Sequence, residues 1–145
     1  MPDIYVLNGP NLNLLGSREP EIYGSMTLSD IAQSVTSTAN KLGKSVEVLQ
    51  TNSEDELIGW IHRAMTEKAS IVLNPAAFTH YSYALRDACA AFTGAGLRLI
   101  EVHITNPHSR EEFRHNSVIS GVATGVIAGF GLDSYLLALE QLSRD

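Results

Sequence analysis

The chain has 145 residues and a formal net charge of −6, with 44% hydrophobic and 18% charged residues. This length predicts one compact domain, and the composition excludes wholesale disorder because enough apolar side chains are present to form a core. Sixteen acidic against ten basic side chains argue against a nucleic-acid-binding surface. An anionic ligand must then be held by a local cluster of arginines, since the overall field repels it.

The cysteine content and the apolar stretches indicate the compartment. Cys89 is the one cysteine of the chain, so no internal disulfide can form, which suits a reducing cytoplasm. The first residues show no basic region followed by an apolar stretch, and we expect no secretory signal. No Asp, Glu, Lys or Arg lies between His115 and Leu132, but this stretch is too short and too polar to cross a bilayer. We expect a buried strand there, a cytoplasmic location and no membrane contact.

Apolar runs and helical periodicities alternate along the chain. Runs rich in Val and Ile that end at Gly, Pro or polar residues predict strands at residues 3–8, 45–50, 70–74, 97–104 and 121–130. Apolar residues at helical spacing predict helices at 27–42, 53–65, 82–92 and 132–142.

The order of these elements predicts the fold class. Thr27 with Asp30, and Ser53 with Glu56, are typical of capping boxes that begin the first two helices. Strand and helix alternate, which is typical of an α/β protein with a parallel sheet and helices on both faces. Right-handed crossovers make it a flavodoxin-like, doubly wound, five-stranded parallel sheet, with strand order 2-1-3-4-5.

In such a sheet the ligand lies beyond the carboxyl ends of the strands. Two connections at that end, residues 9–25 and 105–118, exceed the usual length of about 2–6 residues. The first contains Gly16 and Gly24, which suit the hinges of a lid, and it lacks the lysine of a phosphate-binding loop. The second carries arginines and histidines. His108 and His115 in it have no Cys, His or Asp partner at metal spacing, so we expect no metal site.

Two histidines are candidates for chemistry. His103 lies two residues after Glu101 in a predicted strand, so both side chains lie on the same face. The carboxylate can fix the tautomer of the imidazole and stabilise its protonated form, which suits a general acid. A strand histidine satisfied by a polar neighbour is an equally good interpretation. His80 follows the strand at 70–74, either as a ligand contact or as a helix-capping residue.

Arg18 and Tyr23 lie together in the first long loop. A guanidinium beside a phenol lowers the phenol pKa by about 1–3, which makes the phenolate a usable base. The simpler interpretation packs the tyrosine as an aromatic plug and leaves the arginine in solvent.

Five ordered blocks of sequence then narrow these alternatives. They are GPNLNLLG at 9–16 with Arg18-Glu-Pro20 and Tyr23-Gly24, NPAAFTH at 74–80, ALRD at 84–87, EVHITN at 101–106 with REEFR at 110–114, and ATG at 123–125. Over nearly its whole length the chain resembles the type II 3-dehydroquinate dehydratases (type II dehydroquinases). The resemblance implies reversible loss of water from 3-dehydroquinate through an enolate, in the shikimate pathway of aromatic amino acid biosynthesis. It also implies no cofactor or metal, and trimers that assemble into a homododecamer.

The resemblance implies a role for each matching residue. Tyr23 removes the proton next to the ketone, Arg18 lowers its pKa and holds the enolate, and Asn11 positions a water at that oxygen. His103 protonates the departing hydroxyl. Asn74 contacts both His103 and the substrate, and His80 and Arg114 bind substrate hydroxyls. The backbone of Ile104 and Thr105 binds the substrate carboxylate. Asp87 reaches the site of a neighbouring subunit.

Two other interpretations stay open. A nucleotide-binding or protein-docking module of the same fold predicts a yellow purified protein or thermal stabilisation by a nucleotide. An inactive structural relative predicts a folded oligomer in which Arg18→Ala changes no binding. The chain also departs from the family, with Tyr81 and Tyr83 at positions where smaller residues are more frequent, and we expect altered packing there.

Overall fold

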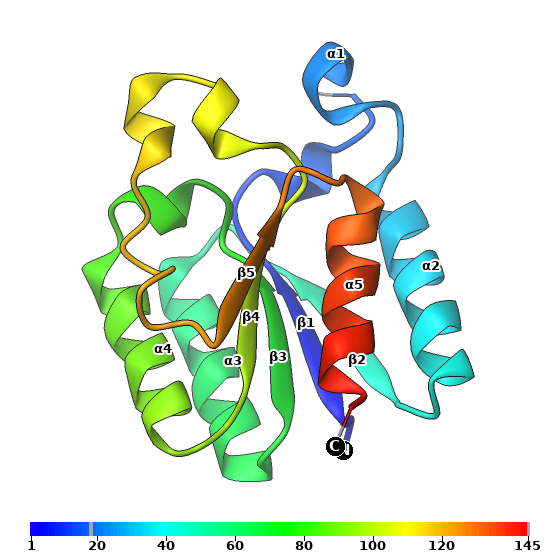
Figure 1. The fold of residues 1–145 in the computed structure, drawn as a ribbon, viewed down its shortest axis with the longest axis vertical. Coiled ribbons are helices and arrows are strands. Elements are labelled where there is room, and N and C mark those ends of the chain that lie inside the picture. The colour runs from blue at the N-terminus through cyan, green and yellow to red at the C-terminus, as the bar shows by residue number, and fades with distance from the viewer. Residues whose placement is uncertain (18, 145) are drawn as a thin grey trace.

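A parallel sheet forms the centre of the molecule (Figure 1). The structure is a computed structural model that describes residues 1–17 and 19–144, and it describes no side chain for residue 23. In these described residues five strands pair in the order β2-β1-β3-β4-β5, all parallel, which confirms the predicted topology. Their bounds are β1 Ile4–Asn8, β2 Val46–Gln50, β3 Ser70–Asn74, β4 Leu99–His103 and β5 Gly125–Ala128.

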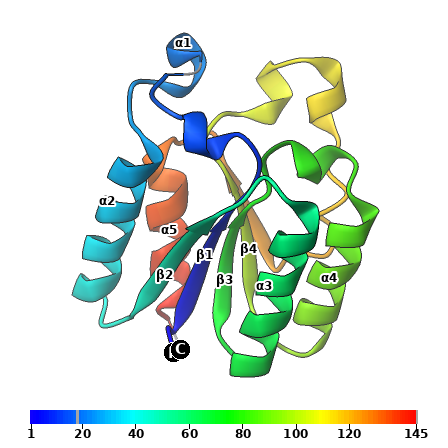
Figure 2. The ribbon, with the colours of Figure 1, turned by 180° about the vertical axis from the view of Figure 1, so that it is seen from behind.

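Helices cover both faces of the sheet, as predicted (Figures 1 and 2). α2 (Leu28–Lys41) and α5 (Leu132–Leu142) lie on one face, and α3 (Glu54–Glu67) and α4 (Tyr83–Gly94) on the other. Side chains alternate along β1, so Ile4 and Val6 pack towards α2 and α5, whereas Tyr5 and Leu7 pack towards α3 and α4. Burial on both faces explains why the central strands read as continuous apolar runs.

The two predicted capping boxes differ in the structure. At the start of α2, Thr27 accepts from the Asp30 N–H and the Asp30 carboxylate accepts from the Thr27 N–H, so the box is complete. At the start of α3, Ser53 accepts from the Glu56 N–H. The Ser53 N–H donates instead to Thr51 Oγ1, at 3.0 Å. The second capping box is therefore only half formed, because the Thr51 hydroxyl accepts from the Ser53 N–H in place of the Glu56 carboxylate.

The expectation of a buried strand at 121–130 is wrong in extent and in burial. β5 covers only four residues, and it is the edge strand of the sheet, where β4 is its one neighbour among the described residues. Val126 is 47% exposed as a result. The residues before β5 form turns, and Thr124 Oγ1 accepts from the Leu99 N–H at 2.9 Å.

The long connections contain short helical turns that the sequence does not reveal. They are η1 (Leu12–Leu14) and α1 (Pro20–Tyr23) after β1, η2 (Ala76–His80) after β3, and η3 (Pro107–Ser109) and η4 (Glu112–His115) after β4. Turns of three to five residues are too short to show a helical period. All five lie at the carboxyl edge of the sheet, opposite both termini (Figure 1). In the part of the chain described, no helix is long and apolar enough to cross a membrane.

Candidate active site

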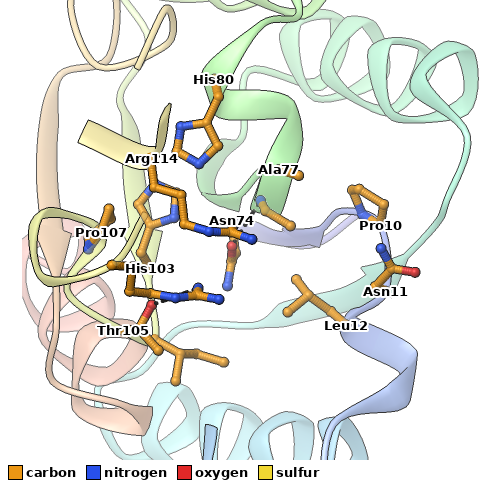
Figure 3. Close-up of a pocket in the computed structure, with 13 residues that line it drawn as sticks. Pro10, Asn11, Leu12, Asn74, Ala77, His80, His103, Thr105, Pro107 and Arg114 are labelled. Atoms are coloured by element: carbon orange, nitrogen blue, oxygen red, sulfur yellow. Dashed lines mark hydrogen bonds between the residues drawn. The ribbon is translucent and has the colours of Figure 1, made fainter. Parts of the chain in front are cut away.

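A cleft opens at the carboxyl ends of β1, β3 and β4, the place predicted for a ligand. It encloses about 570 Å³, including space open to solvent. In Figure 3, His103, Arg114 and Thr105 lie on one side and Pro10, Asn11 and Leu12 face them. The lining residues among those described are Pro10, Asn11, Leu12, Asn74, Ala76, Ala77, His80, His103, Ile104, Thr105, Pro107, Arg110 and Arg114.

The charged groups of the cleft are all basic or potentially basic. Arg110 and Arg114 line it together with two histidines, and none of the described lining residues is an Asp or Glu. Arg110 donates to Thr105 Oγ1 at 3.3 Å, and Arg114 donates to Glu111 at 3.2 Å. This local field attracts an anion despite the net charge of −6. Arg110 was not assigned from the sequence, although the requirement for an arginine cluster was the signal that points to it.

Glu101 and His103 lie on the same face of β4, which confirms the prediction from strand alternation. His103 Nε2 is 2.5 Å from Glu101 Oε2, and Glu101 is fully buried. Three hydroxyls also donate to this carboxylate, Thr79 Oγ1 at 2.6 Å, Ser120 Oγ at 2.5 Å and Ser117 Oγ at 3.4 Å.

The charge state of Glu101 sets the tautomer of its partner. Burial raises the pKa of Glu101, but the hydrogen bond and charge of His103, with the Ser120 and Thr79 hydroxyls, outweigh burial and hold this pKa below its usual value. The carboxylate therefore only accepts, and His103 Nε2 must donate to it. Nδ1 is then the ring nitrogen that serves a ligand in the cleft. The structure thus favours the acid–base interpretation of this pair.

His80 lines the cleft and is not merely a capping residue. Its Nδ1 is 2.8 Å from the backbone oxygen of Asn116, which fixes Nδ1 as the donor. Burial lowers the pKa of His80, the Asn116 carbonyl opposes this shift, and the charges of Arg114 and His103 lower the pKa further. The ring is therefore neutral near pH 7, and its Nε2 can accept a hydrogen bond from a hydroxyl.

Asn11 lies in a left-handed turn, with φ of 68°, that other side chains support. Its N–H donates to Asn52 Oδ1 at 2.9 Å, and Gln50 Nε2 donates to the same oxygen at 3.1 Å. A Cβ at Gly9 would lie 2.6 Å from the Pro75 carbonyl oxygen. The loops after β1 and β3 can approach this closely only because residue 9 has no side chain.

The predicted base and its arginine are not placed by the structure. Arg18 lies outside the described residues, as does the side chain of Tyr23. The backbone of Tyr23 ends α1, and its neighbours Ile22 and Gly24 line a hollow. This hollow shares Ile104, Thr105 and Arg110 with the cleft.

Asp87 does not line the cleft of its own chain. Its side chain on α4 is 74% exposed and pairs with Arg86 at 2.9 Å. The prediction that it reaches a neighbouring subunit's site stays a prediction.

Other candidates considered from the sequence lie away from this chemistry. Cys89 is fully buried, and burial raises the pKa of its thiol to about 12, so it is a core residue, as predicted. Tyr81 and Tyr83 are exposed and do not line the cleft. Within the described residues, no group of three or more His, Cys, Asp and Glu side chains is placed to hold a metal ion.

The parallel α/β sheet, the basic cleft at its carboxyl edge and the buried carboxylate–imidazole pair define a class: α/β enzymes with an acid–base site for a small anion. The sequence model of the family described as "Dehydroquinase class II" matches residues 2–143 of this chain. The chain belongs to this family, as the sequence resemblance predicts, and the prediction of an enzyme of this type is confirmed.

Individual relatives agree with this assignment. A "3-dehydroquinate dehydratase" of Salinispora tropica is 54% identical over 140 residues, covering 97% of this chain and 96% of that protein. A "3-dehydroquinate dehydratase 2" of Pseudomonas aeruginosa is 54% identical over 141 residues, covering 97% and 93%. The crystal structure of a type II dehydroquinase from Propionibacterium acnes superposes with a TM-score of 0.94 at 50% identity, covering 98% of this chain and 96% of that one.

Proposed function

We propose that this chain dehydrates 3-dehydroquinate to 3-dehydroshikimate through an enolate, as a step of the shikimate pathway. The observation that carries the proposal is the buried Glu101–His103 pair, which opens onto a cleft whose charged groups are all basic among the lining residues that the structure describes. The relatives named as 3-dehydroquinate dehydratases support the choice of substrate.

The first step removes the proton from the carbon next to the ketone. Tyr23 is the base, and Arg18 lowers its pKa because a neighbouring positive charge favours the phenolate. The electron pair of the broken C–H bond moves onto the ketone oxygen and forms an enolate. Arg18 and a water held by Asn11 stabilise that oxygen, since donors placed before the reaction stabilise charge as it develops.

The second step expels the hydroxyl. The enolate re-forms the ketone, the carbon–oxygen bond of the hydroxyl breaks, and His103 gives its proton to the departing oxygen, which leaves as water. Glu101 stabilises the protonated imidazole before transfer. After one turnover Tyr23 carries the substrate proton and His103 lacks one, so a net proton must return from Tyr23 to His103 before the next cycle.

The remaining residues hold the substrate. Asn74 contacts His103 and the substrate, while His80 and Arg114 bind its hydroxyls. The backbone of Ile104 and Thr105 binds the carboxylate, and the charges of Arg110 and Arg114 favour the anion. We further propose that Asp87 reaches the site of a neighbouring subunit, within trimers that assemble into a dodecamer, and that the enzyme acts in the cytoplasm.

The direct test adds 3-dehydroquinate to the purified protein and follows the ultraviolet absorbance of the conjugated product. Tyr23→Phe should abolish turnover and keep substrate binding, measured by calorimetry, because only the ionisable hydroxyl is removed. Tyr81→Phe is the matched control, since this tyrosine is exposed and lies outside the cleft. It should retain full activity.

Three results would count against the proposal. A folded wild-type protein that produces no absorbance rise, with or without divalent metal, refutes the activity. Thermal stabilisation by a nucleotide in that case would favour the nucleotide-binding module instead. Full turnover by Tyr23→Phe would refute the role of Tyr23 as the base.

A further inference from the structure

A buried chain of three polar side chains lies directly behind the cleft. Asn74 Nδ2 donates to the Tyr135 hydroxyl at 2.8 Å, and this hydroxyl donates to Asn8 Oδ1 at 2.7 Å. Tyr135 and Asn8 are fully buried, and Asn74 is 3% exposed. Asn74 lines the cleft, whereas Tyr135 and Asn8 do not, so neither of these two residues can touch a substrate there.

The fold brings the three residues together from distant parts of the sequence. Asn8 ends β1 and Asn74 ends β3, and the two are direct partners in the strand register. Strand alternation places both on the face of Val6 and Val72, which α5 covers. Tyr135, on α5, reaches both amides from this face.

Backbone groups at both ends fix the direction of every hydrogen bond in this chain. Asn8 Nδ2 donates to the carbonyl oxygen of Leu49, at 3.1 Å, and a carbonyl can only accept. Asn8 must therefore turn Oδ1 towards Tyr135, whose hydroxyl donates to it and accepts from Asn74 Nδ2. At the other end, Asn74 Oδ1 accepts from the N–H of Ala76, which can only donate.

This directionality gives the Asn74 amide a single orientation. Each of its two polar atoms has one partner inside the protein, which leaves one N–H and one lone pair of the amide for other partners. The orientation persists over the working pH range, because burial raises the pKa of the Tyr135 hydroxyl far above neutrality, although the bond from Asn74 opposes this. A neutral hydroxyl is at once the donor to Asn8 and the acceptor from Asn74.

We propose that Tyr135 is a positioning residue of the active site, which holds the Asn74 amide in the one orientation that serves His103 and the substrate. The inference rests on the proposed dehydratase function. Three buried polar side chains are costly unless all are paired, and here the pairing ends on a residue of the cleft. Tyr135 thus acts through Asn74, with Asn8 as its support.

The test compares Tyr135→Phe with a matched control. Tyr5 is also a fully buried tyrosine, and its hydroxyl donates to Glu67 at 2.5 Å, on the opposite face of the sheet. Tyr5→Phe therefore removes a similar hydrogen bond that has no connection to the cleft. We expect Tyr135→Phe to lower kcat/KM about tenfold, which corresponds to about 1.4 kcal/mol, and Tyr5→Phe to change it less than about twofold.

A double-mutant cycle separates positioning from a general loss of stability. If Tyr135 acts through Asn74, Tyr135→Phe should change kcat/KM by less than about twofold in an Asn74→Ala background, since the group that it orients is gone. Should Tyr135→Phe fail to fold, Asn8→Ala tests the same chain of bonds. It leaves the aromatic ring in place and removes the acceptor of the hydroxyl, so it should lower kcat/KM in the wild-type background alone.

Each failure has a distinct signature. If the wild type turns over substrate and Tyr135→Phe has the same kcat/KM as Tyr5→Phe, the positioning role is overturned and the dehydratase function stays intact. An equal loss from Tyr135→Phe in the wild-type and Asn74→Ala backgrounds overturns action through Asn74. Absence of turnover by folded wild-type protein refutes the dehydratase function, and the positioning role with it.

Discussion

Glu101→Gln isolates the charge that Glu101 supplies to His103. Thr79 and His103 both donate to Oε2, whereas Ser120 donates to Oε1. A glutamine with its oxygen at the Oε2 position keeps the first two bonds. Its NH2 group then faces Ser120, whose hydroxyl can turn to accept. The variant therefore preserves the hydrogen-bond geometry and removes only the negative charge.

The expected loss of activity follows from the 2.5 Å contact between Glu101 and His103. A hydrogen bond to a charged group contributes about 1.5–3 kcal/mol. The protonated imidazole loses this stabilisation in the variant. If His103 is the general acid, kcat falls by about 10- to 100-fold. The free energy of unfolding should change by no more than about 1 kcal/mol, because the hydrogen bonds are kept and the substitution removes the buried negative charge itself.

The assay measures kcat from the absorbance of the conjugated product and stability from urea titration. Glu140→Gln is the control, because Glu140 forms an exposed ion pair with Arg144 and lies far from the cleft. It should leave both quantities unchanged. A Glu101→Gln protein that folds and keeps wild-type kcat would refute the role of the carboxylate in the acid step.

Three further predictions concern the same region. Ser120→Ala removes a hydrogen bond to the Glu101 carboxylate, so the free energy of unfolding in urea should fall by about 1.5–3 kcal/mol. Half-buried Ser143 donates to the uncharged backbone carbonyl of Glu140, so Ser143→Ala should cost less than about 1 kcal/mol, and equal losses would contradict the argument. Gly9→Ala places a Cβ 2.6 Å from the Pro75 carbonyl oxygen, so the free energy of unfolding should fall by about 1–3 kcal/mol, and kcat should fall with it. An unchanged urea midpoint would show that the loops after β1 and β3 can move apart at no cost. Because the folded state holds the pKa of Glu101 below its ordinary 4.5, the unfolded chain binds that proton more readily, and the free energy of unfolding should decrease as the pH falls below 4.5. Urea titrations across this range should show a weaker dependence for Glu101→Gln, and an equal dependence would exclude Glu101 as a contributor.

Much of the fold follows from local patterns in the sequence. Alternation of strands and helices predicts the parallel sheet and its order, because right-handed crossovers leave few other topologies. The spacing of Glu101 and His103 places both on one face of β4, since side chains alternate along a strand. The family resemblance and the position of each motif at a strand end identify the cleft residues Asn11, Asn74 and Arg114.

Local patterns fail where a competing neighbour or the tertiary structure decides. Thr51 Oγ1 displaces the predicted bond of Glu56 at the start of α3. β5 is shorter and more exposed than its apolar sequence predicts because it lies at the edge of the sheet. Arg110 lies between the turns η3 and η4 and lines the cleft, and turns of three or four residues leave no periodic signal in the sequence.

Periodicity, spacing and motifs within short segments are enough to predict the class of fold, the family and the residue types available for catalysis. Which polar groups meet depends on how distant segments pack together. The hydroxyls that surround Glu101 come from η2 and from the turns before β5, and the tyrosine that orients Asn74 lies 61 residues away along the chain. Such partners are chosen by the packing of the two faces of the sheet, and no local pattern contains that information.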